Sequence, residues 1–445
     1  MKSNKILQSK RTLIVSLLFI LTFTRLNASV VQIDGVNYSN ESFGLAEGEV
    51  LITGINHETI AAEVVIPEKI TINDVEYTVT RIAREAFAYN TTITSITLPA
   101  GLKYIDSYAF YQCQNLSDIK GFPEKLDYIG NGAFSNTQWI INLEKNAPAG
   151  FYLVGGWVLG YVGKMPETLT FPNNTIGICD NFATRLSYTY YSYVKKIVLN
   201  EGLKYINRSA FYYFLGLTEI TLPVSLEVIE NDAFESCYNI ERYTVPDENP
   251  VFSASDGVLY NKEQTKLILY PTGKNITDVV ISNNVTEIAE YAFYGAQHIK
   301  SLTIPEGVTS IPNQTIREMP ALETVILPST ISFFGFGIFY GCNNLKSIVL
   351  YAENVPTYYG IDLSVLTETT LYVPETAINA YKADEYWSKM VNIQPIKQNT
   401  DVARIVIEDG KNDGRIYNLN GQCVSHPEQG GIYIKNGKKI INHSW

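Results

Sequence analysis

The sequence predicts an α/β-type repeat solenoid that is mostly β, because one pattern returns along the chain at a nearly constant interval. Phenylalanines that directly follow an alanine recur 23 or 24 residues apart, and the same slot continues later in 23-residue steps. The series comprises Phe87, Phe110, Phe134, Phe211, Phe234, Phe293, Ile316 and Phe339. A fixed period of this length is typical of a solenoid in which one supersecondary unit repeats.

Each repeat has two parts. The first is Leu-x-x-Ile-x-Leu-Pro, as in 217–223, and its alternating apolar and β-branched residues predict a short strand that proline ends. The second is Leu-x-x-Ile-x-x-x-Ala-Phe, as in 203–211, which begins extended and finishes in a turn or a short helical stretch. One unit cannot bury these residues alone, so we expect stacking to form a continuous ladder of Leu, Ile and Phe.

The composition favours an ordered, acidic chain. Of 445 residues, 46% are hydrophobic and 18% are charged, which excludes general disorder. The net charge of -11 argues against nucleic acid as a partner, because a basic face is needed to neutralise phosphates. The four histidines do not pair at metal-ligand spacing, and the carboxylates form no recurrent pair. We therefore expect no enzyme activity, no metal and no cofactor.

The N-terminus is typical of a secretory signal. Lys2, Lys5 and Arg11 belong to a basic region, and 12–23 is apolar but short for a membrane span. We predict cleavage near Ala28, so that residues 1–28 are a signal peptide and the mature chain has no membrane span. The expected location is therefore secreted or at the outer cell surface.

Three of the five cysteines occupy one slot of the repeat. Cys113, Cys237 and Cys342 each come three residues after a repeat phenylalanine or its equivalent. Residues in the same slot lie at the same depth in a stack, which favours reduced core cysteines. The alternative for an exported chain is a set of disulfides with one free thiol.

The fullest repeat motif is Ala-Phe-x-x-Cys-x-Asn-Leu, which occupies 109–116 and, with Ile338 in place of alanine, 338–345. This motif resembles that of the BspA-like leucine-rich repeat family of secreted bacterial proteins. The resemblance covers roughly 79–350. It implies a leucine-rich-repeat array with a sheet of stacked short strands, a surface-binding or adhesive role, and no catalytic residues to transfer.

The domain boundaries follow from where the period begins, breaks and ends. We expect N-terminal cap strands over 29–78, about nine repeats over 79–350, and a C-terminal cap over 351–397 with a helix from 376 to 387. Two longer intervals predict hairpin insertions near 140–170 and 247–275. The last segment, 398–445, combines a polar linker with a short tail that resembles the C-terminal sorting segments of Bacteroidetes-type exported proteins. A purely structural hairpin is the other interpretation of this tail.

The strand residues between the apolar positions point to the outer face of the sheet and are the first candidate ligand contacts. One outward row contains a charged zone formed by Asp118, Lys196, Glu219 and Arg242. These residues either contact a ligand or form a ladder of complementary charges that only supports the sheet.

Aromatic residues are the second candidate. Several tyrosines stand close together over 188–193, and they cannot all face inward on one strand. Exposed tyrosine is enriched in contact surfaces, although packing of an irregular repeat explains the cluster equally well. We select Tyr190 and Tyr191, together with Trp157 of the first insertion, as candidate ligand contacts.

These observations predict an exported, non-enzymatic protein of the cell surface or medium that acts as a monomer. Its expected partner is an extracellular protein of a host or neighbouring cell, which makes adhesion the main functional hypothesis. The alternative, based on the tyrosines and Trp157, is a glycan-binding module for polysaccharide capture.

Overall fold

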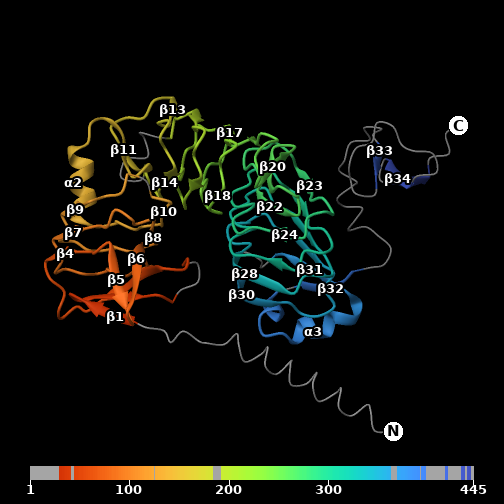
Figure 1. Ribbon diagram of the computed structural model, residues 1–445. Coiled ribbons are helices and arrows are strands. Elements are labelled where there is room, and N and C mark those ends of the chain that lie inside the picture. Colours follow the sequence, from red (N-terminus) through yellow and green to blue (C-terminus); the bar gives the residue numbers. More distant parts are fainter. Residues whose placement is uncertain are drawn as a thin grey trace, which may run out of the picture. The chain divides into compact units, whose positions relative to one another are not determined.

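The computed structural model describes residues 30–41, 45–124, 126–183, 192–361, 368–390 and 392–396, and the backbone of three strands in 416–441. It confirms the predicted fold class, because the chain forms a mostly-β solenoid of about 13 stacked turns with few helices (Figure 1). The turns divide into two units, one up to Asn142 and one from Leu143, and each is described by itself. The predicted signal peptide lies outside the described residues, as do Tyr190 and Tyr191.

The N-terminal unit begins with the strands that the sequence predicts for its cap. Strands β1 to β3 form an antiparallel meander, and β5 pairs antiparallel with β6. Two parallel ladders then start, β3-β6-β8-β10 and β4-β7-β9. The strands are β1 (Val30–Ile33), β2 (Val36–Ser39), β3 (Glu49–Ile55), β4 (Glu63–Val65), β5 (Lys69–Ile72), β6 (Val75–Ile82), β7 (Ser95–Thr97), β8 (Tyr104–Ile105), β9 (Asp118–Lys120) and β10 (Tyr128–Ile129).

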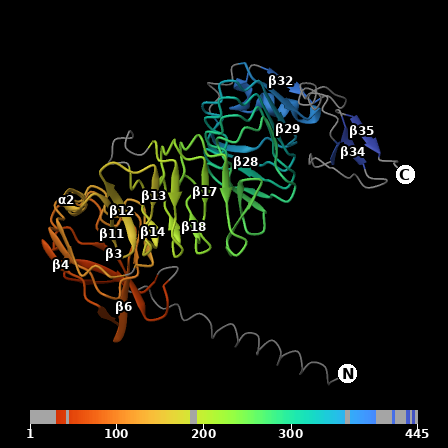
Figure 2. The same ribbon diagram turned by 90° about the horizontal axis from the view of Figure 1, so that it is seen from above.

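In the C-terminal unit, every turn contributes a strand from the first part of the repeat, and these strands form what we call the first ladder. Figure 2 shows them from above, with β13, β17 and β29 labelled. They pair in parallel within the groups β13-β15, β17-β19 and β23-β25-β27-β29-β31-β32. Their bounds are β13 (Thr168–Thr170), β15 (Lys196–Val198), β17 (Glu219–Thr221), β19 (Arg242–Thr244), β23 (Asp278–Val280), β25 (Ser301–Thr303), β27 (Thr324–Leu327), β29 (Ser347–Leu350), β31 (Thr370–Val373) and β32 (Asn392–Pro395).

The second part of each repeat supplies a second ladder in the same unit. Its parallel groups are β12-β14-β16-β18, β22-β24 and β26-β28-β30. The strands are β12 (Trp157–Val162), β14 (Gly177–Ile178), β16 (Tyr205–Ile206), β18 (Val228–Ile229), β22 (Lys266–Leu269), β24 (Glu287–Ile288), β26 (Ser310–Ile311), β28 (Phe333–Ile338) and β30 (Thr357–Ile361). Two short strands per turn, joined by tight turns, leave little room for helix.

Both predicted insertions are present, and both do more than decorate the array. After helix α2 (Gln138–Asn146), the first insertion forms an antiparallel hairpin of β11 (Gly150–Val154) and β12. The second is a three-stranded antiparallel meander of β20 (Phe252–Ser255), β21 (Val258–Asn261) and β22. The last strand of each insertion then pairs in parallel with the next turn, β12 with β14 and β22 with β24. Each insertion therefore supplies one strand of the second ladder.

The core follows the repeat pattern. In the first ladder the central residue of a strand is buried while its neighbours are more exposed, as in Glu219, Ile220 and Thr221. The repeat phenylalanines are buried and stack from turn to turn, with ring centroids 5.1 Å apart between Phe211 and Phe234. The turns that carry them are joined by backbone hydrogen bonds, since the Phe211 amide donates to the Ala233 carbonyl at 2.8 Å.

The prediction of reduced core cysteines is confirmed for the four cysteines in the described part of the chain. Cys113, Cys179, Cys237 and Cys342 are all free and buried. The Cys237 thiol donates to the Phe211 carbonyl oxygen of the preceding turn, at 2.9 Å. Burial raises the pKa of Cys113 to about 11 and that of Cys237 to about 12, so both remain thiols at neutral pH.

The sheet continues beyond the predicted repeat range, which explains why there are about 13 turns and not nine. At the C-terminal end, β31 and β32 extend the first ladder. The predicted helix over 376–387 is shorter than expected, because α3 covers Ile378–Ala383 between two 3₁₀ turns, Glu375–Ala377 and Trp387–Lys389. Tyr381 and Trp387 are buried against the last turns, whereas Ala380 is exposed.

The tail contains a three-stranded antiparallel sheet of β33 (Ile416–Asn418), β34 (Ile432–Lys435) and β35 (Lys438–Ile441). Strands β34 and β35 flank Asn436 and Gly437, where the sequence predicts a hairpin. Among the residues that the structure describes, no helix is both long and apolar enough to cross a membrane.

Candidate binding surface

The outward face of the first ladder brings two of the predicted charged residues together. The parallel register of β17 and β19 sets Glu219 opposite Arg242, and the Arg242 guanidinium donates to the Glu219 carboxylate at 2.7 Å. The Thr244 hydroxyl donates to the other carboxylate oxygen at 3.3 Å. The hydrogen bond from Arg242 is the main cause of the lowered pKa of Glu219, and the same bond raises the pKa of Arg242.

Lys196 belongs to the same face. Its strand β15 lies beside β17, and its charge helps to lower the pKa of Glu219. Lys196 is exposed and forms no ion pair with any residue in the described ranges, in contrast to Arg242. An exposed cation beside an ion pair can bind a carboxylate of a partner at little cost, because its own ion-pairing capacity is unused.

The fourth charged residue, Asp118, belongs to the N-terminal unit. It lies on β9, and its carboxylate pairs with Lys120 of the same strand at 3.2 Å. Both side chains are at least half exposed, so the pair contributes little to stability. Val349 departs from the predicted alternation, in which a strand residue between two apolar positions points outward. It stands between Ile348 and Leu350 of β29, yet it is buried between Ile326 and Tyr372 of the neighbouring strands.

The structure places Trp157 in the core. Its side chain has no exposed surface, and its ring stacks on Tyr205 with centroids 5.5 Å apart. A Cβ atom at Gly177 would lie 2.4 Å from the indole ring, so only glycine leaves room for it. Since a ligand cannot reach a residue this deeply packed, Trp157 is not part of the surface proposed below.

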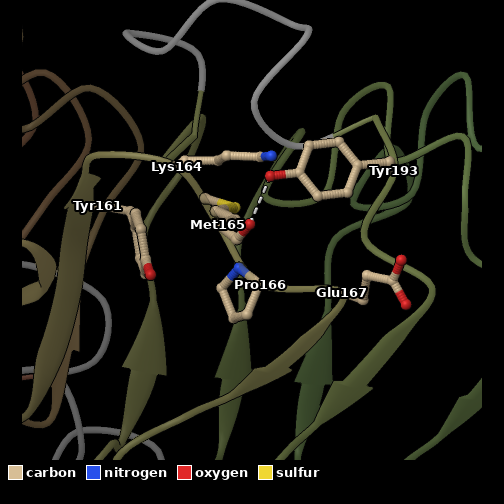
Figure 3. A pocket seen from close by; sticks show the side chains of 6 residues that line it. All are labelled: Tyr161, Lys164, Met165, Pro166, Glu167 and Tyr193. Atoms are coloured by element: carbon tan, nitrogen blue, oxygen red, sulfur yellow. Dashed lines mark hydrogen bonds between the residues drawn. The ribbon is translucent and has the colours of Figure 1, made fainter.

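Figure 3 shows a pocket of about 550 Å³. It begins where β12 ends, and its lining includes the connection from β12 to β13. Pairing of Thr168 with Lys196 brings the start of β13 beside the residues before β15, which completes the pocket wall. The lining residues are Tyr161, Lys164, Met165, Pro166, Glu167 and Tyr193.

Hydrogen bonding and a cation–π contact fix the geometry of this pocket. The Tyr193 hydroxyl donates to the Met165 carbonyl oxygen at 2.6 Å, and the Lys164 ammonium lies 4.9 Å from the centre of the Tyr193 ring. Such a contact at an exposed position contributes about 0.5–1 kcal/mol. The second ring, Tyr161, stands on the other side of the Met165 backbone, and its burial raises the pKa of its phenol.

The pocket combines two aromatic rings with one cation and one anion. The carboxylate of Glu167 pairs with Lys195 at 3.3 Å, while Lys164 faces Tyr193. The lining offers hydrogen-bond donors, acceptors and flat apolar surface, but no nucleophile held by a base. Across the described ranges, no group of three or more His, Cys, Asp or Glu side chains is arranged to hold a metal ion. The arrangement suits recognition of a ligand surface.

The sequence pointed to only one of the residues that line this pocket. The tyrosine-rich segment 188–193 drew attention, and Tyr193 does line the pocket. Tyr161, Lys164 and Glu167 were missed, because they belong to the first insertion and lie outside the repeat motif. The available signal was the break in the period, since an insertion in a repeat array often adds residues to one face.

Comparison with protein-family models gives a match to the BspA type leucine rich repeat region. Six copies match within residues 66–150, 184–273 and 270–360, which is more than half of the chain. The chain belongs to this family. The resemblance found in the sequence is thus confirmed. Proteins with these repeats are generally non-enzymatic, and leucine-rich repeat proteins in general bind other proteins.

Several solved structures match the chain over most of its length. A leucine rich cell surface protein from Faecalibacterium prausnitzii A2-165 is 20% identical, with 83% of this chain and 96% of that chain covered and a TM-score of 0.36. The pneumococcal vaccine antigen PcpA is 18% identical, with coverages of 84% and 99% and a TM-score of 0.35. A leucine-rich repeat protein from Eubacterium ventriosum is 18% identical, with coverages of 82% and 83% and a TM-score of 0.37. No curated protein matches the chain.

Proposed function

We propose that this chain is an exported, non-enzymatic leucine-rich repeat protein that binds proteins of a host or neighbouring cell. It would act as a monomer, secreted or held at the outer cell surface. The observation that carries the proposal is the outward face of β15, β17 and β19, where Lys196 and the Glu219–Arg242 pair are exposed side by side. The basic and apolar N-terminal segment supports export.

A ladder of this kind is suited to protein recognition for a physical reason. The strands are held in register by their backbone hydrogen bonds and by the buried core beneath, so the outward side chains start from fixed positions. Binding of a partner therefore immobilises few additional side chains of this chain, which lowers the entropic cost of binding. Charged side chains around such a surface fix the orientation and speed of association.

The test is a binding screen of the full chain against immobilised extracellular matrix proteins, run beside a glycan array. For any protein that binds, Arg242→Glu should weaken binding at least tenfold, because it places two carboxylates opposite each other. The matched control is Asp278→Asn, on an exposed position of β23 in the same ladder, which should leave binding unchanged. Equal binding by Arg242→Glu and the wild-type chain would refute the assignment of this face.

A glycan-binding function is the second candidate, and the pocket in Figure 3 supports it. Two tyrosine rings flanked by Lys164 and Glu167 provide both a stacking surface and polar contacts. In the same screen, this alternative predicts binding to sugars alone, with loss of that binding in Tyr193→Ala. Such a result would replace the protein-binding proposal with polysaccharide capture.

A further inference from the structure

The pocket in Figure 3 lies where positive charge gathers on an otherwise acidic chain. The two segments that form it, 161–170 and 192–200, contain three lysines and one glutamate, whereas the whole chain has a net charge of -11. The lysines are Lys164, Lys195 and Lys196, and the glutamate is Glu167. This local excess of cations favours an anionic ligand, because charge complementarity steers association and excludes ligands of the wrong charge.

Backbone hydrogen bonds hold the lysines beside the pocket. The Glu167 carbonyl oxygen accepts from the Lys195 amide at 2.8 Å and from the Lys196 amide at 3.1 Å. One turn of chain earlier, the Met165 carbonyl oxygen accepts from the Tyr193 hydroxyl at 2.6 Å. The two segments are thus tied together at two places, so the positions of the cations are set by the backbone.

Most of this positive charge is available to a ligand. Lys164 is exposed and forms no ion pair with any residue in the described part of the chain. Lys195 pairs with Glu167 at 3.3 Å, but both side chains are 66% exposed, and ion pairs this exposed are weak and exchange easily. The next acidic side chain along the sheet, Glu219, is already paired with Arg242.

The other groups of the pocket suit a sugar ring. Figure 3 shows Met165 and Pro166 between the rings of Tyr161 and Tyr193. The Tyr161 ring is itself held edge to face by Phe151, with centroids 5.0 Å apart. Each phenol offers a flat apolar face, which matches the C–H face of a pyranose, and a hydroxyl at its edge. The volume of about 550 Å³ lies within the range of about 300–1,000 Å³ that small-molecule sites occupy.

We propose that this pocket binds an acidic sugar, meaning a pyranose that carries a carboxylate. The carboxylate binds the Lys164 ammonium, the ring lies against the tyrosines, and the Glu167 carboxylate accepts from sugar hydroxyls. The inference rests on the glycan-binding candidate given above and names its class of sugar. A neutral sugar leaves Lys164 unused. An acidic peptide meets the same lysines, but it offers no rigid ring to lie against Tyr161 and Tyr193, and ordering it costs more entropy.

The test is isothermal titration calorimetry of the full chain with two pairs of sugars. The first pair is trigalacturonate and its carboxyl-reduced, neutral counterpart, which represent a carboxylate within a polysaccharide. The second pair is sialyllactose and lactose, which represent a carboxylate at the end of a glycan. In at least one pair, the acidic sugar should bind at least tenfold more tightly than the neutral one. This advantage should shrink as the salt concentration rises, because the lysines are exposed.

Variants of the free lysine assign the binding to the pocket. Lys164→Gln should weaken binding of the acidic sugar at least tenfold, whereas Lys164→Arg, which keeps the charge, should restore most of it. The matched control is Lys382→Gln on helix α3, which removes one exposed lysine elsewhere and should leave binding unchanged. Since both lysines are exposed, all three variants should melt at the wild-type temperature, which separates lost binding from lost folding.

The outcomes distinguish this inference from the function on which it rests. Equal binding of acidic and neutral sugars would keep the glycan function but overturn the acidic class. Unchanged binding by Lys164→Gln would also overturn the inference. If no sugar binds, the glycan function fails and the inference fails with it. If a glutamate-rich peptide binds in a Lys164-dependent manner and no sugar does, the pocket serves an acidic protein segment and the inference is wrong.

Discussion

Removal of the Phe234 ring should destabilise the C-terminal unit strongly, because this ring joins consecutive turns. Phe234 is 4% exposed, and it stacks on Phe211 with centroids 5.1 Å apart and an interplanar angle of 6°. It also meets Tyr243 edge to face at 5.8 Å. Phe234→Ala removes both contacts and leaves a cavity, so we expect the free energy of unfolding to fall by about 3–5 kcal/mol. The stacked pair accounts for about 0.5–1.5 kcal/mol of this loss.

The measurement is urea unfolding of the full chain, followed by far-ultraviolet circular dichroism. The free energy of unfolding falls by about 1–3 kcal/mol per molar urea, so the expected loss of stability should lower the unfolding midpoint by about 1 M or more. Each turn is stabilised mainly by its neighbours, so the loss should spread to the flanking turns. Hydrogen exchange should therefore accelerate in β16 and β18 together and not at one strand alone.

Two variants test whether the effect comes from burial. Phe336→Ala is a matched control, because it makes the same substitution at a side chain that is 58% exposed. Thr221→Ala changes an exposed residue on the outward face of β17, near Phe234 in the sequence. Each variant should lower the free energy of unfolding by less than about 1 kcal/mol. If either variant proved as damaging as Phe234→Ala, the assignment of inner and outer faces would be wrong, and the proposed binding surface with it.

Three further predictions concern individual side chains. Asn249→Ala should lower the free energy of unfolding by at least about 2 kcal/mol, because the buried amide nitrogen donates to three carbonyl groups and the amide oxygen accepts from two backbone amides. A loss below about 0.5 kcal/mol in chemical denaturation would contradict this. Cys237, whose pKa burial raises to about 12, should resist iodoacetamide at pH 8 and react only in denaturant; rapid labelling of the native chain would refute it. Glu219 should titrate below the ordinary glutamate pKa in an NMR experiment, and Arg242→Gln should move its midpoint upward. Because the folded pKa is lowered, the stabilisation from this pair is complete at neutral pH and is lost as pH falls through the folded pKa.

The fold could be predicted from the sequence because stacking requires the same residue type at the same depth in every turn. The phenylalanine slot shows this directly, since Phe87, Phe110 and Phe134 form one stack with centroids 5.0 and 5.6 Å apart. The role of the insertions was harder to predict, because a hairpin pattern does not reveal with which other strands its own strands pair. The sequence showed hairpins near 140–170 and 247–275, but not that β12 and β22 would join the second ladder.

The candidate surface was predictable only where it follows the repeat. Glu219 and Arg242 occupy the same slot of neighbouring turns, so their pairing at 2.7 Å follows from the period. Trp157 was misjudged for a related reason, because it stands in an insertion where the repeat says nothing about inside and outside. Its burial depends on the space above Gly177, which is a property of the three-dimensional packing.

The second insertion shows where prediction from the repeat ends. In a regular array every surface position is bordered by its own equivalents in the next turn. The second insertion omits one Ala-Phe turn, so that Tyr270 stacks on Phe293 and the ring of Tyr238 lies against Gly295. These residues occupy unlike positions of the repeat, and no motif links them. Contacts of this kind depend on how the chain returns to the array after an insertion, which the period of the sequence does not contain.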